Sequence, residues 1–577
     1  MFRKLRRQSS KEQDKNQELF KRLERIEQKL DGKVFAEDVF IDRIDEKDVL
    51  PLIKRDKDSI RIAKRAIKDV IEPFPNFETV PFDETFDWEV TKEKYGHSYQ
   101  LYIQSLRVVS ALLLEYEKTN KLTYLNKAQE IVESWMDYAE GKTESAMTWY
   151  DHLTANRAQI LIHFLYHARN HFELNMTRYA NMLERHAKVM SDPSIYKYNN
   201  HSLMMDRALI IIGRILNKEQ FVQLGISRAV ETFWYSFSAK GIHLENSPSY
   251  HGMVIKIYDE LEAYLNQFER TLGEVILQYL EKAKKYYSLI AKPNYELPEL
   301  GDSSGGKVGT KVFENVFDYE LGLVIMQYEK PKPVYTTFIS GMSGKTHKHS
   351  DDLSITLSYG DEDILVDAGR FNYSKSPVRS YMTSARAHST LYMKGKQYPR
   401  ENENRFTRSI DLTSYFDSDT HTLAIGKNEA FDDSSLYRTV IQLKEFPIIF
   451  VFDSAKTEDK TLVQNFNLHH AVEVLEHSKA EATLKLKSGQ SVLLKQLKSV
   501  ESYEVREPSE DKVQAVNTKS FGNTIDTKQL AFSVTDSSAE YVFETMIVMN
   551  PALDVNTVRE DNVLYVTVDG KKIVINL

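Results

Sequence analysis

The order of hydrophobic and polar positions divides the chain into a helical part and a β-rich part. From about residue 50 to 295, apolar residues recur every three or four positions, as in RVVSALLLEYEKTN at 107–120. A 3.6-residue period gathers these leucines on one side of a helix, whereas a strand would expose them. The succession of such segments predicts antiparallel helix pairs joined by short loops, in either a solenoid or a closed ring. The lack of a fixed-length repeat in the sequence disfavours the solenoid.

A change of composition marks the end of the helical part. Pro, Gly, Asp and Ser cluster in KPNYELPELGDSSGGKVGT at 292–310, and short apolar runs such as PIIFVFDSA at 447–455 then alternate with turns. Many short strands without intervening helices predict an antiparallel β-sandwich. We therefore expect a polar helical extension at 1–45, a helical domain at 46–300 and a β-sandwich domain at 301–577.

The polar extension carries one apolar stripe at helical spacing. Its members are Leu19, Leu23, Ile26 and Leu30. A solvated helix lying on the body is one interpretation, and a short helix for homo-oligomerisation or a basic contact with a membrane surface are the others. The basic N-terminal segment lacks the apolar stretch of a secretory signal. The sequence also contains no run of about 18 apolar residues, the length that a membrane-spanning helix needs. We therefore expect a cytoplasmic protein.

Composition limits the possible functions of the chain more than it limits the possible folds. The formal net charge of −8 argues against a general nucleic-acid-binding protein, but a local cleft can still accept an anionic substrate. The chain contains no cysteine, which excludes disulfides and thiolate chemistry. Its 32 tyrosines are more than packing alone usually demands. Tyrosine-rich sugar clefts and tyrosine-rich large sheets explain this surplus equally well.

Three stretches of the helical part carry polar groups that can do chemistry, and two of them, YNNHSLMM and HLENSPSYHGMV, are predicted helix starts. They lie in TWYDHLTANRAQI, YNNHSLMM and HLENSPSYHGMV, and the groups are Asp151, His152, Arg157, Asn199, Asn200, His201, Glu245, Asn246, Tyr250 and His251. Taken singly, most are better explained as helix caps or capping loops. His152 and Arg157 are also candidates for binding acidic groups of a substrate, because a guanidinium presents a fork to carboxylate or sulfate.

Histidines and an aspartate recur at strand ends in the β-rich part. His347 and His349 stand in KTHKHSDDLS, Asp367 interrupts the apolar run ILVDAG, and His388 follows in ARAHST. Two imidazoles and a carboxylate from separate strands match the donors of a zinc-type site with an open fourth position. A buried hydrogen-bonded network without a metal is the alternative.

Taken together, these segments resemble the heparinase II/III-like polysaccharide lyases. HKHSDDLS, the strand ending in DAG and ARAHSTLYM resemble the C-terminal motif of that family, and NNH and ENSPSYH resemble the paired motifs of its helical domain. The resemblance covers roughly residues 80 to 450, and GDSS at 301–304 fits it too. It implies an incomplete (α/α) toroid followed by an antiparallel β-sandwich. Ser389 departs from the family pattern, which usually has Asn after the histidine, and the N-terminal helix has no counterpart in the family.

The resemblance also implies a chemistry, the β-elimination of glycosidic bonds to uronic acids. Asn200 and His201 would donate hydrogen bonds to the uronate carboxylate, which stabilises the charge that moves onto it. Tyr250 would take the C5 proton as phenolate and return a proton to the leaving oxygen, and His347 would be a second acid/base. Further substrate contacts are expected from His152, Arg157, Glu245 and Tyr373.

A metal follows from the same resemblance. His349, Asp367 and His388 would hold a zinc ion with a mainly structural role near the active site. The charge of Asp367 inside its apolar run would then be balanced by the cation.

Two other classes of function remain open at this level. A glycoside hydrolase would need two carboxylates flanking the bond, and Glu245 and Asp151 are available. A non-catalytic glycan-binding protein of a capsule or exopolysaccharide pathway would make no use of Tyr250. Hyaluronate-, heparan-, chondroitin- and alginate-type substrates, and exolytic or endolytic cleavage, are all compatible with the sequence; short uronic-acid oligosaccharides are the expected substrates of a cytoplasmic enzyme.

Overall fold

The computed structural model describes residues 40–373, 375–457, 460–535 and 541–577. Two compact units make up the chain. The helical unit runs to Tyr235 and includes Glu260–Leu272, and the sandwich unit consists of Ser236–Asp259 and Gly273–Leu577. The stripe from Leu19 to Leu30 lies outside the described residues, so its interpretations stay open. The domain limits expected at residues 45 and 300 likewise stay predictions.

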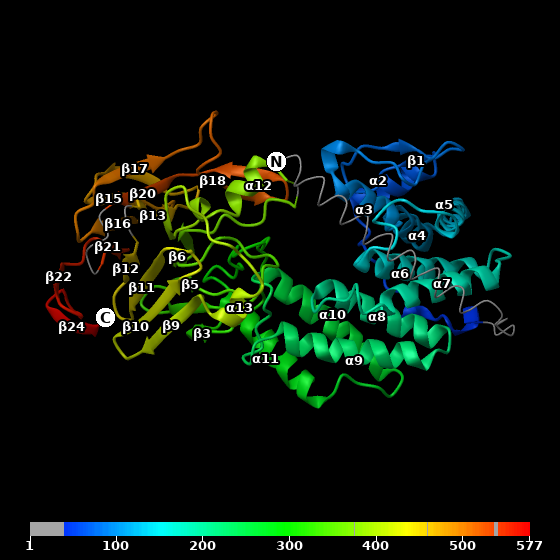
Figure 1. Ribbon diagram of the computed structural model, residues 1–577, viewed down its shortest axis with the longest axis horizontal. Helices are drawn as coiled ribbons and strands as arrows, with labels where there is room; N and C mark the ends of the chain where they lie inside the picture. Colours follow the sequence, from blue (N-terminus) through cyan, green and yellow to red (C-terminus); the bar gives the residue numbers. More distant parts are fainter. Residues whose placement is uncertain (1–39, 374, 458–459, 536–540) are drawn as a thin grey trace. The chain divides into compact units, whose positions relative to one another are not determined.

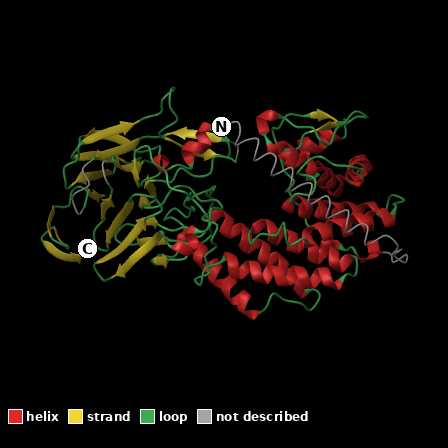
Figure 2. Cartoon of the chain, viewed as in Figure 1, coloured by secondary structure: helices red, strands yellow, loops and turns green. Residues whose placement is uncertain are grey.

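Amphipathic helices build the helical unit, as the apolar spacing predicts (Figure 1; Figure 2). Helix α6 packs against α3, α4, α5, α7 and α8, and its Leu161, Phe164 and Leu165 are fully buried. Each such side chain stabilises the fold by roughly 1.5–3 kcal/mol relative to leaving it in water. The elements are η1 (Phe40–Arg43), η2 (Glu46–Asp48), α2 (Lys57–Ala66), β1 (Val70–Ile71), β2 (Val80–Pro81), η3 (Glu93–Tyr95), α3 (His97–Gln104), α4 (Arg107–Thr119), α5 (Leu122–Glu140), α6 (Asp151–Ala168), α7 (Met176–Ser191), α8 (Asn200–Ile215) and α9 (Glu219–Ser236). Helix α10 (Pro248–Asn266) begins in the sandwich unit and ends in the helical unit.

Antiparallel sheets dominate the sandwich unit. An eight-stranded sheet has the order β14-β15-β16-β21-β12-β11-β10-β9, and a five-stranded sheet runs β3-β4-β5-β6-β7. A four-stranded sheet β17-β20-β13-β8, the pair β18-β19 and the three-stranded sheet β22-β23-β24 complete the unit. The strands that follow α11 (Glu274–Ile290) confirm the predicted order of helices first and antiparallel strands afterwards.

The bounds of these strands follow from short apolar runs ended by turn residues. They are β3 (Val316–Asp318), β4 (Leu323–Tyr328), β5 (Val334–Ile339), β6 (Ser354–Tyr359), β7 (Glu362–Leu365), β8 (Leu391–Met393), β9 (Ile410–Asp417), β10 (His421–Asn428), β11 (Ser435–Leu443), β12 (Ile448–Lys456), β13 (Leu462–Asn467), β14 (Glu473–His477), β15 (Glu481–Lys485), β16 (Ser491–Gln496), β17 (Ser502–Arg506), β18 (Val516–Ser520), β19 (Asn523–Asp526), β20 (Gln529–Val534), β21 (Phe543–Val548), β22 (Val555–Glu560), β23 (Val563–Val568) and β24 (Lys571–Asn576). Two short helices, α12 (Pro377–Met382) and α13 (Asn404–Thr407), interrupt the series.

Both faces of the eight-stranded sheet are covered, which explains the continuous apolar runs. In β12, Ile449 and Val451 join a core with side chains of the five- and four-stranded sheets. Phe450 and Phe452 point to the opposite face, where the strands β23 and β24 cover them. A strand buried on both faces reads as an unbroken hydrophobic run.

The five-stranded sheet positions the candidate site of the sandwich unit. Its outer face packs on α11, where Tyr335 contacts a cluster that includes Tyr286 and Ile290. The connection from β5 to β6 carries the HKH motif, so its loop starts and ends in well-packed strands. In the described part of the chain, none of the helices combines the length and the apolar character that crossing a bilayer requires.

Candidate active site

Two helix starts in the helical unit bring a carboxylate and two imidazoles together. Asp151 and His152 begin α6, and His201 lies in the first turn of α8. His152 Nδ1 lies 2.7 Å from Asp151 Oδ1, and His201 Nδ1 lies 3.4 Å from Asp151 Oδ2. The two rings are 4.0 Å apart between centroids. One carboxylate therefore orients both rings through Nδ1.

The two neighbouring asparagines have different tasks. The side chain of Asn199 accepts hydrogen bonds from the backbone N–H groups of His201 and Ser202, which confirms the capping interpretation for this residue. Asn200 is the first residue of α8 and is buried. The side chain of His201 remains 34% exposed, so its ring can still meet a ligand.

The Asp151 carboxyl stays ionised inside its cluster. Burial alone would raise the pKa of the Asp151 carboxyl, but hydrogen bonds from His152 and His201 outweigh burial and lower it well below its usual range. Burial also lowers the pKa of His152 despite its bond to Asp151. Asp151 is therefore a carboxylate across the physiological range, and His152 is a neutral ring beside it.

Arg157 does not have the exposure that its predicted substrate role requires. It is fully buried, and its Nε donates to His186 Nε2 at 3.0 Å. Its other nitrogens donate to the carbonyls of Gln104 and Thr148 at 2.8 and 2.6 Å. The guanidinium lies 4.1 Å from the Trp135 ring centroid, and burial lowers the pKa of the arginine to about 9. We therefore do not keep the expectation that Arg157 binds substrate, because its donors are used inside the unit.

In the sandwich unit, two tyrosines and a histidine from three segments meet. Tyr250 lies in the first turn of α10, and its hydroxyl lies 2.7 Å from that of Tyr373. The ring of Tyr250 stacks on that of His347 with centroids 3.6 Å apart and an interplanar angle of 18°. The sequence motifs ENSPSYH, HKH and RFNY thus supply one cluster. Partial burial, together with the neighbouring Tyr250 and Asp302, raises the pKa of Tyr373, which keeps its hydroxyl protonated.

Two carboxylates hold the His347 ring. His347 Nε2 lies 3.3 Å from a Glu245 oxygen, and Nδ1 lies 3.5 Å from Asp302 Oδ2. Burial favours the neutral ring, but the bonds to Asp302 and Glu245 outweigh it and raise the pKa of His347. Glu245, expected to touch substrate, is therefore placed beside the histidine of this cluster.

Asp302 is a central residue that sequence reasoning missed. It accepts hydrogen bonds from His349 Nε2 at 3.0 Å and from both terminal nitrogens of Arg379 at 2.5 and 2.8 Å. Burial alone would raise the pKa of the Asp302 carboxyl, but hydrogen bonds from His347, His349 and Arg379 outweigh burial and lower it. The GDSS motif was a clue: Gly301 has a φ of 54°, and a Cβ there would lie 2.7 Å from the carbonyl oxygen of His347. Only glycine lets the two loops pack this closely.

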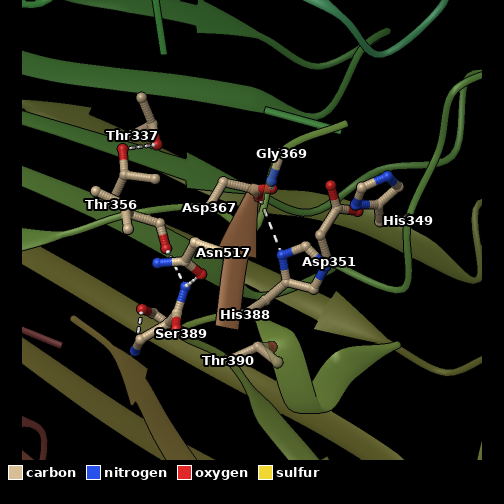
Figure 3. A network of polar contacts seen from close by, with 12 residues as sticks. Thr337, His349, Asp351, Thr356, Asp367, Gly369, His388, Ser389, Thr390 and Asn517 are labelled. Carbon is tan, nitrogen blue, oxygen red and sulfur yellow. Dashed lines mark hydrogen bonds and ion pairs between the residues drawn. The ribbon is translucent and has the colours of Figure 1, made fainter. Parts of the chain in front are cut away.

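The predicted metal ligands lie together in the sandwich unit (Figure 3). His349, Asp367 and His388 are buried, and each offers a ligand atom within 4.8 Å of the others. His388 Nδ1 lies 3.0 Å from Asp367 Oδ2. Its Nε2 and His349 Nδ1 are buried without a hydrogen-bond partner. Two orphaned imidazole nitrogens beside a carboxylate fit the donor set of a metal site.

Two more groups with donors at ligand spacing occur among the described residues, both in the helical unit. One is the Asp151, His152 and His201 cluster, and the other consists of Glu117, His163 and His167. In the latter, one oxygen of Glu117 lies 2.7 and 3.0 Å from the two Nε2 atoms. In these two groups, one nitrogen of every imidazole ring is bonded to the carboxylate of the group. In the sandwich cluster, by contrast, His388 Nε2 and His349 Nδ1 have no hydrogen-bond partner.

Family models match most of the chain. The model described as "Heparinase II/III N-terminus" matches residues 39–319, and the one described as "Heparinase II/III-like, C-terminal" matches residues 320–544. No curated protein matches the chain.

Solved structures share the fold at low sequence identity. The crystal structure of heparinase III has a TM-score of 0.77 at 15% identity, over 93% of this chain and 95% of that chain. Heparan sulfate lyase HepC from Pedobacter heparinus has a TM-score of 0.65 at 15% identity, over 94% and 92% of the two chains. Chondroitin AC lyase from Streptomyces coelicolor A3, in complex with chondroitin sulphate, has 0.53 at 10%, over 93% and 84%. These likenesses confirm the predicted fold, an incomplete (α/α) toroid followed by an antiparallel β-sandwich.

Proposed function

This chain belongs to the heparinase II/III-like family and is a polysaccharide lyase, and we propose that it cleaves uronic-acid-containing glycans by β-elimination. In this reaction a base removes the proton at C5, the electron pair forms the C4–C5 double bond, and the C4–O bond breaks. The leaving oxygen then takes up a proton. No water is consumed, which separates the reaction from hydrolysis.

The contact between Tyr250 and Tyr373 is the observation that carries this proposal. A free tyrosine has a pKa of about 10, so a tyrosine base needs a neighbour that favours its phenolate. Tyr373 stays protonated and lies 2.7 Å from the Tyr250 oxygen, so it can donate a hydrogen bond to that phenolate. Tyr250 is then the group that takes the C5 proton and returns one to the leaving oxygen.

Asn200 and His201 would act on the substrate carboxylate. Charge moves from C5 onto that carboxylate in the transition state, and hydrogen-bond donors stabilise it there. Asp151 accepts from His201 Nδ1, which leaves Nε2 for the substrate, and Nε2 donates to the uronate carboxylate when the ring is protonated on both nitrogens. His152, held by the same carboxylate, would be a further contact to the substrate.

His347 would serve as a second acid/base group. Its ring stacks on Tyr250 and is held by Glu245 and Asp302, so its orientation is fixed before substrate arrives. A residue fixed in this way loses little entropy when the substrate binds. Glu245 then acts on the substrate through His347.

A zinc ion would be held by His349, Asp367 and His388, whose unpartnered nitrogens and carboxylate fit it. When bound, it would supply positive charge that balances Asp367 and restrains the loops around His347. The role is structural. Asp302 joins the two clusters, because it contacts His349 as well as His347.

The substrate is proposed at the level of its chemistry. The similar proteins are named for heparan sulfate and chondroitin, both acidic glycans. Hyaluronate-, heparan-, chondroitin- and alginate-type oligosaccharides are the candidates for this chain. The cytoplasmic location expected from the sequence stays a prediction, which cell fractionation tests.

The experiment is a panel of uronic-acid polymers and their oligomers, followed by near-ultraviolet absorbance. We expect new absorbance from the C4–C5 double bond with at least one member of the panel. Reducing ends that appear without this absorbance would instead indicate a hydrolase. A protein that binds members of the panel but cleaves none of them would be a glycan-binding protein.

A further inference from the structure

A stacked pair of exposed aromatic side chains lies at the chain segment that leads into α8, the helix that carries His201. Tyr198 and Tyr235 are 43% and 46% exposed, and their rings stack with centroids 4.8 Å apart and an interplanar angle of 30°. Trp234, beside Tyr235 in α9, is also 46% exposed. Single exposed aromatic residues need no explanation, but a stacked pair is a patch that water solvates poorly.

The position of this pair along the chain connects it to the proposed catalytic groups. Tyr198 directly precedes Asn199, the cap of α8, and stands three positions before His201. On the other helix start, the ring of Tyr150 lies 5.6 Å from His152, whose ring lies 4.0 Å from His201. Aromatic surface thus adjoins both helix starts that carry the Asp151 cluster.

We infer that Tyr198 and Tyr235 form a sugar-binding subsite, which holds a pyranose ring next to the cleaved uronic acid residue. This inference rests on the proposed function, because it assigns a second subsite to the same glycan substrate. A pyranose presents an apolar face of C–H groups and a rim of hydroxyls, and flat aromatic rings with polar tips complement both.

Polar groups beside the two tyrosine rings can form hydrogen bonds with sugar hydroxyls. The Tyr198 hydroxyl lies 3.4 Å from a carboxylate oxygen of Glu231, which is one turn before Tyr235 in α9. A carboxylate accepts hydrogen bonds from sugar hydroxyls, and it repels sulfate and carboxylate groups. The subsite therefore favours an uncharged sugar over a second uronic acid or a sulfated ring.

The first test measures cleavage as a function of chain length. Tyr198→Ala and Tyr235→Ala should each lower kcat/KM about tenfold on hexasaccharides, and much less on the shortest oligosaccharide that is cleaved. Tyr198→Phe keeps the ring and should restore most of the activity. Phe406→Ala removes an aromatic side chain that is 77% exposed in the sandwich unit, and serves as the matched control.

The second test reads binding without catalysis. Trp234 is the exposed one of the four tryptophans, because Trp88, Trp135 and Trp149 are buried. In the Tyr250→Phe variant, binding of a hyaluronan hexasaccharide should protect the fluorescence of Trp234 from quenching by acrylamide. Adding the substitution Tyr198→Ala should remove this protection. An all-uronate hexasaccharide should protect less, and Glu231→Gln should reduce that difference.

The outcomes separate the inference from the function on which it rests. If the wild-type protein cleaves uronic-acid glycans and both alanine variants keep the wild-type length dependence, the subsite is wrong and the lyase stands. If no glycan yields the unsaturated product, the proposed function fails, while the fluorescence test still reports on sugar binding. Loss of activity in Phe406→Ala equal to that in Tyr198→Ala would also overturn the subsite.

Discussion

The two histidines proposed to act on substrate are held in different ways in the two units. His347 lies between two carboxylates and stacks on Tyr250, and its side chain is only 12% exposed. His201 has one carboxylate partner at 3.4 Å and is 34% exposed. The sandwich unit therefore fixes its cluster before substrate arrives, whereas the helical unit leaves a ring that can adjust to a ligand. Substitutions should accordingly affect turnover most in the first cluster and binding most in the second.

The largest effect is expected from Tyr250→Phe. Removing the hydroxyl that takes the C5 proton should lower kcat by about 10³-fold, the range that general acid–base groups supply. The ring stack on His347 is kept, so the melting temperature should change little. Activity within tenfold of wild type would show that another group is the base. Tyr373→Phe removes only the hydroxyl that stabilises the phenolate and should cost less.

Metal removal should act mainly on stability in the sandwich unit. His349→Ala and His388→Ala should abolish zinc content measured by mass spectrometry, and a chelator should lower the melting temperature of the wild-type protein but not of these variants. His167→Ala, from the Glu117 group, is the control that should keep the metal. A wild-type protein purified with added zinc that holds none, and that gains no thermal stability from it, would contradict this site.

Asp151→Asn tests the looser cluster of the helical unit. An amide no longer stabilises a His201 ring that is protonated on both nitrogens, so we expect kcat/KM to fall about 10- to 100-fold, mostly through KM. Asp151→Glu should recover part of the loss. Glu117→Gln is the matched control, because Glu117 also binds two histidines in the same unit, and it should leave kcat/KM unchanged. Equal losses in both variants would mean that Asp151 is only structural.

The smallest effect concerns the acid stability of the Glu117 group. Burial would raise the pKa of Glu117, but bonds from His163 and His167 outweigh burial and lower it from 4.5 to about 2. A lowered carboxyl pKa contributes stability above the unfolded value, and this contribution disappears as the pH falls through the folded value. The stability advantage of wild type over Glu117→Gln should thus shrink as the pH falls from about 5 toward 2. Thermal unfolding at several pH values measures it, and a difference that grows on acidification would contradict the assignment.

The sequence predicts the elements of both units better than the partners within each site. Helical period placed α6 and α8, and the motifs NNH, ENSPSYH and HKH located the groups that the structure shows at helix starts and in loops. Asp302 and Arg379 could not be paired in advance, because 77 residues separate them and their contact depends on how loops pack. For Arg157 the sequence predicted an exposed group that binds substrate, but the structure shows a buried one. Its burial depends on partners on a neighbouring helix, such as His186, that the local sequence does not reveal.

The bond chemistry itself can be decided by one measurement of mass balance. A uronic-acid oligosaccharide that the protein cleaves is digested in H₂¹⁸O, and the products are weighed by mass spectrometry. The account predicts fragments whose masses add up to that of the substrate, with no ¹⁸O incorporated at the cleaved bond. One ¹⁸O atom per cleavage would mean that water attacks the glycosidic bond, and the β-elimination assigned to Tyr250 would be wrong.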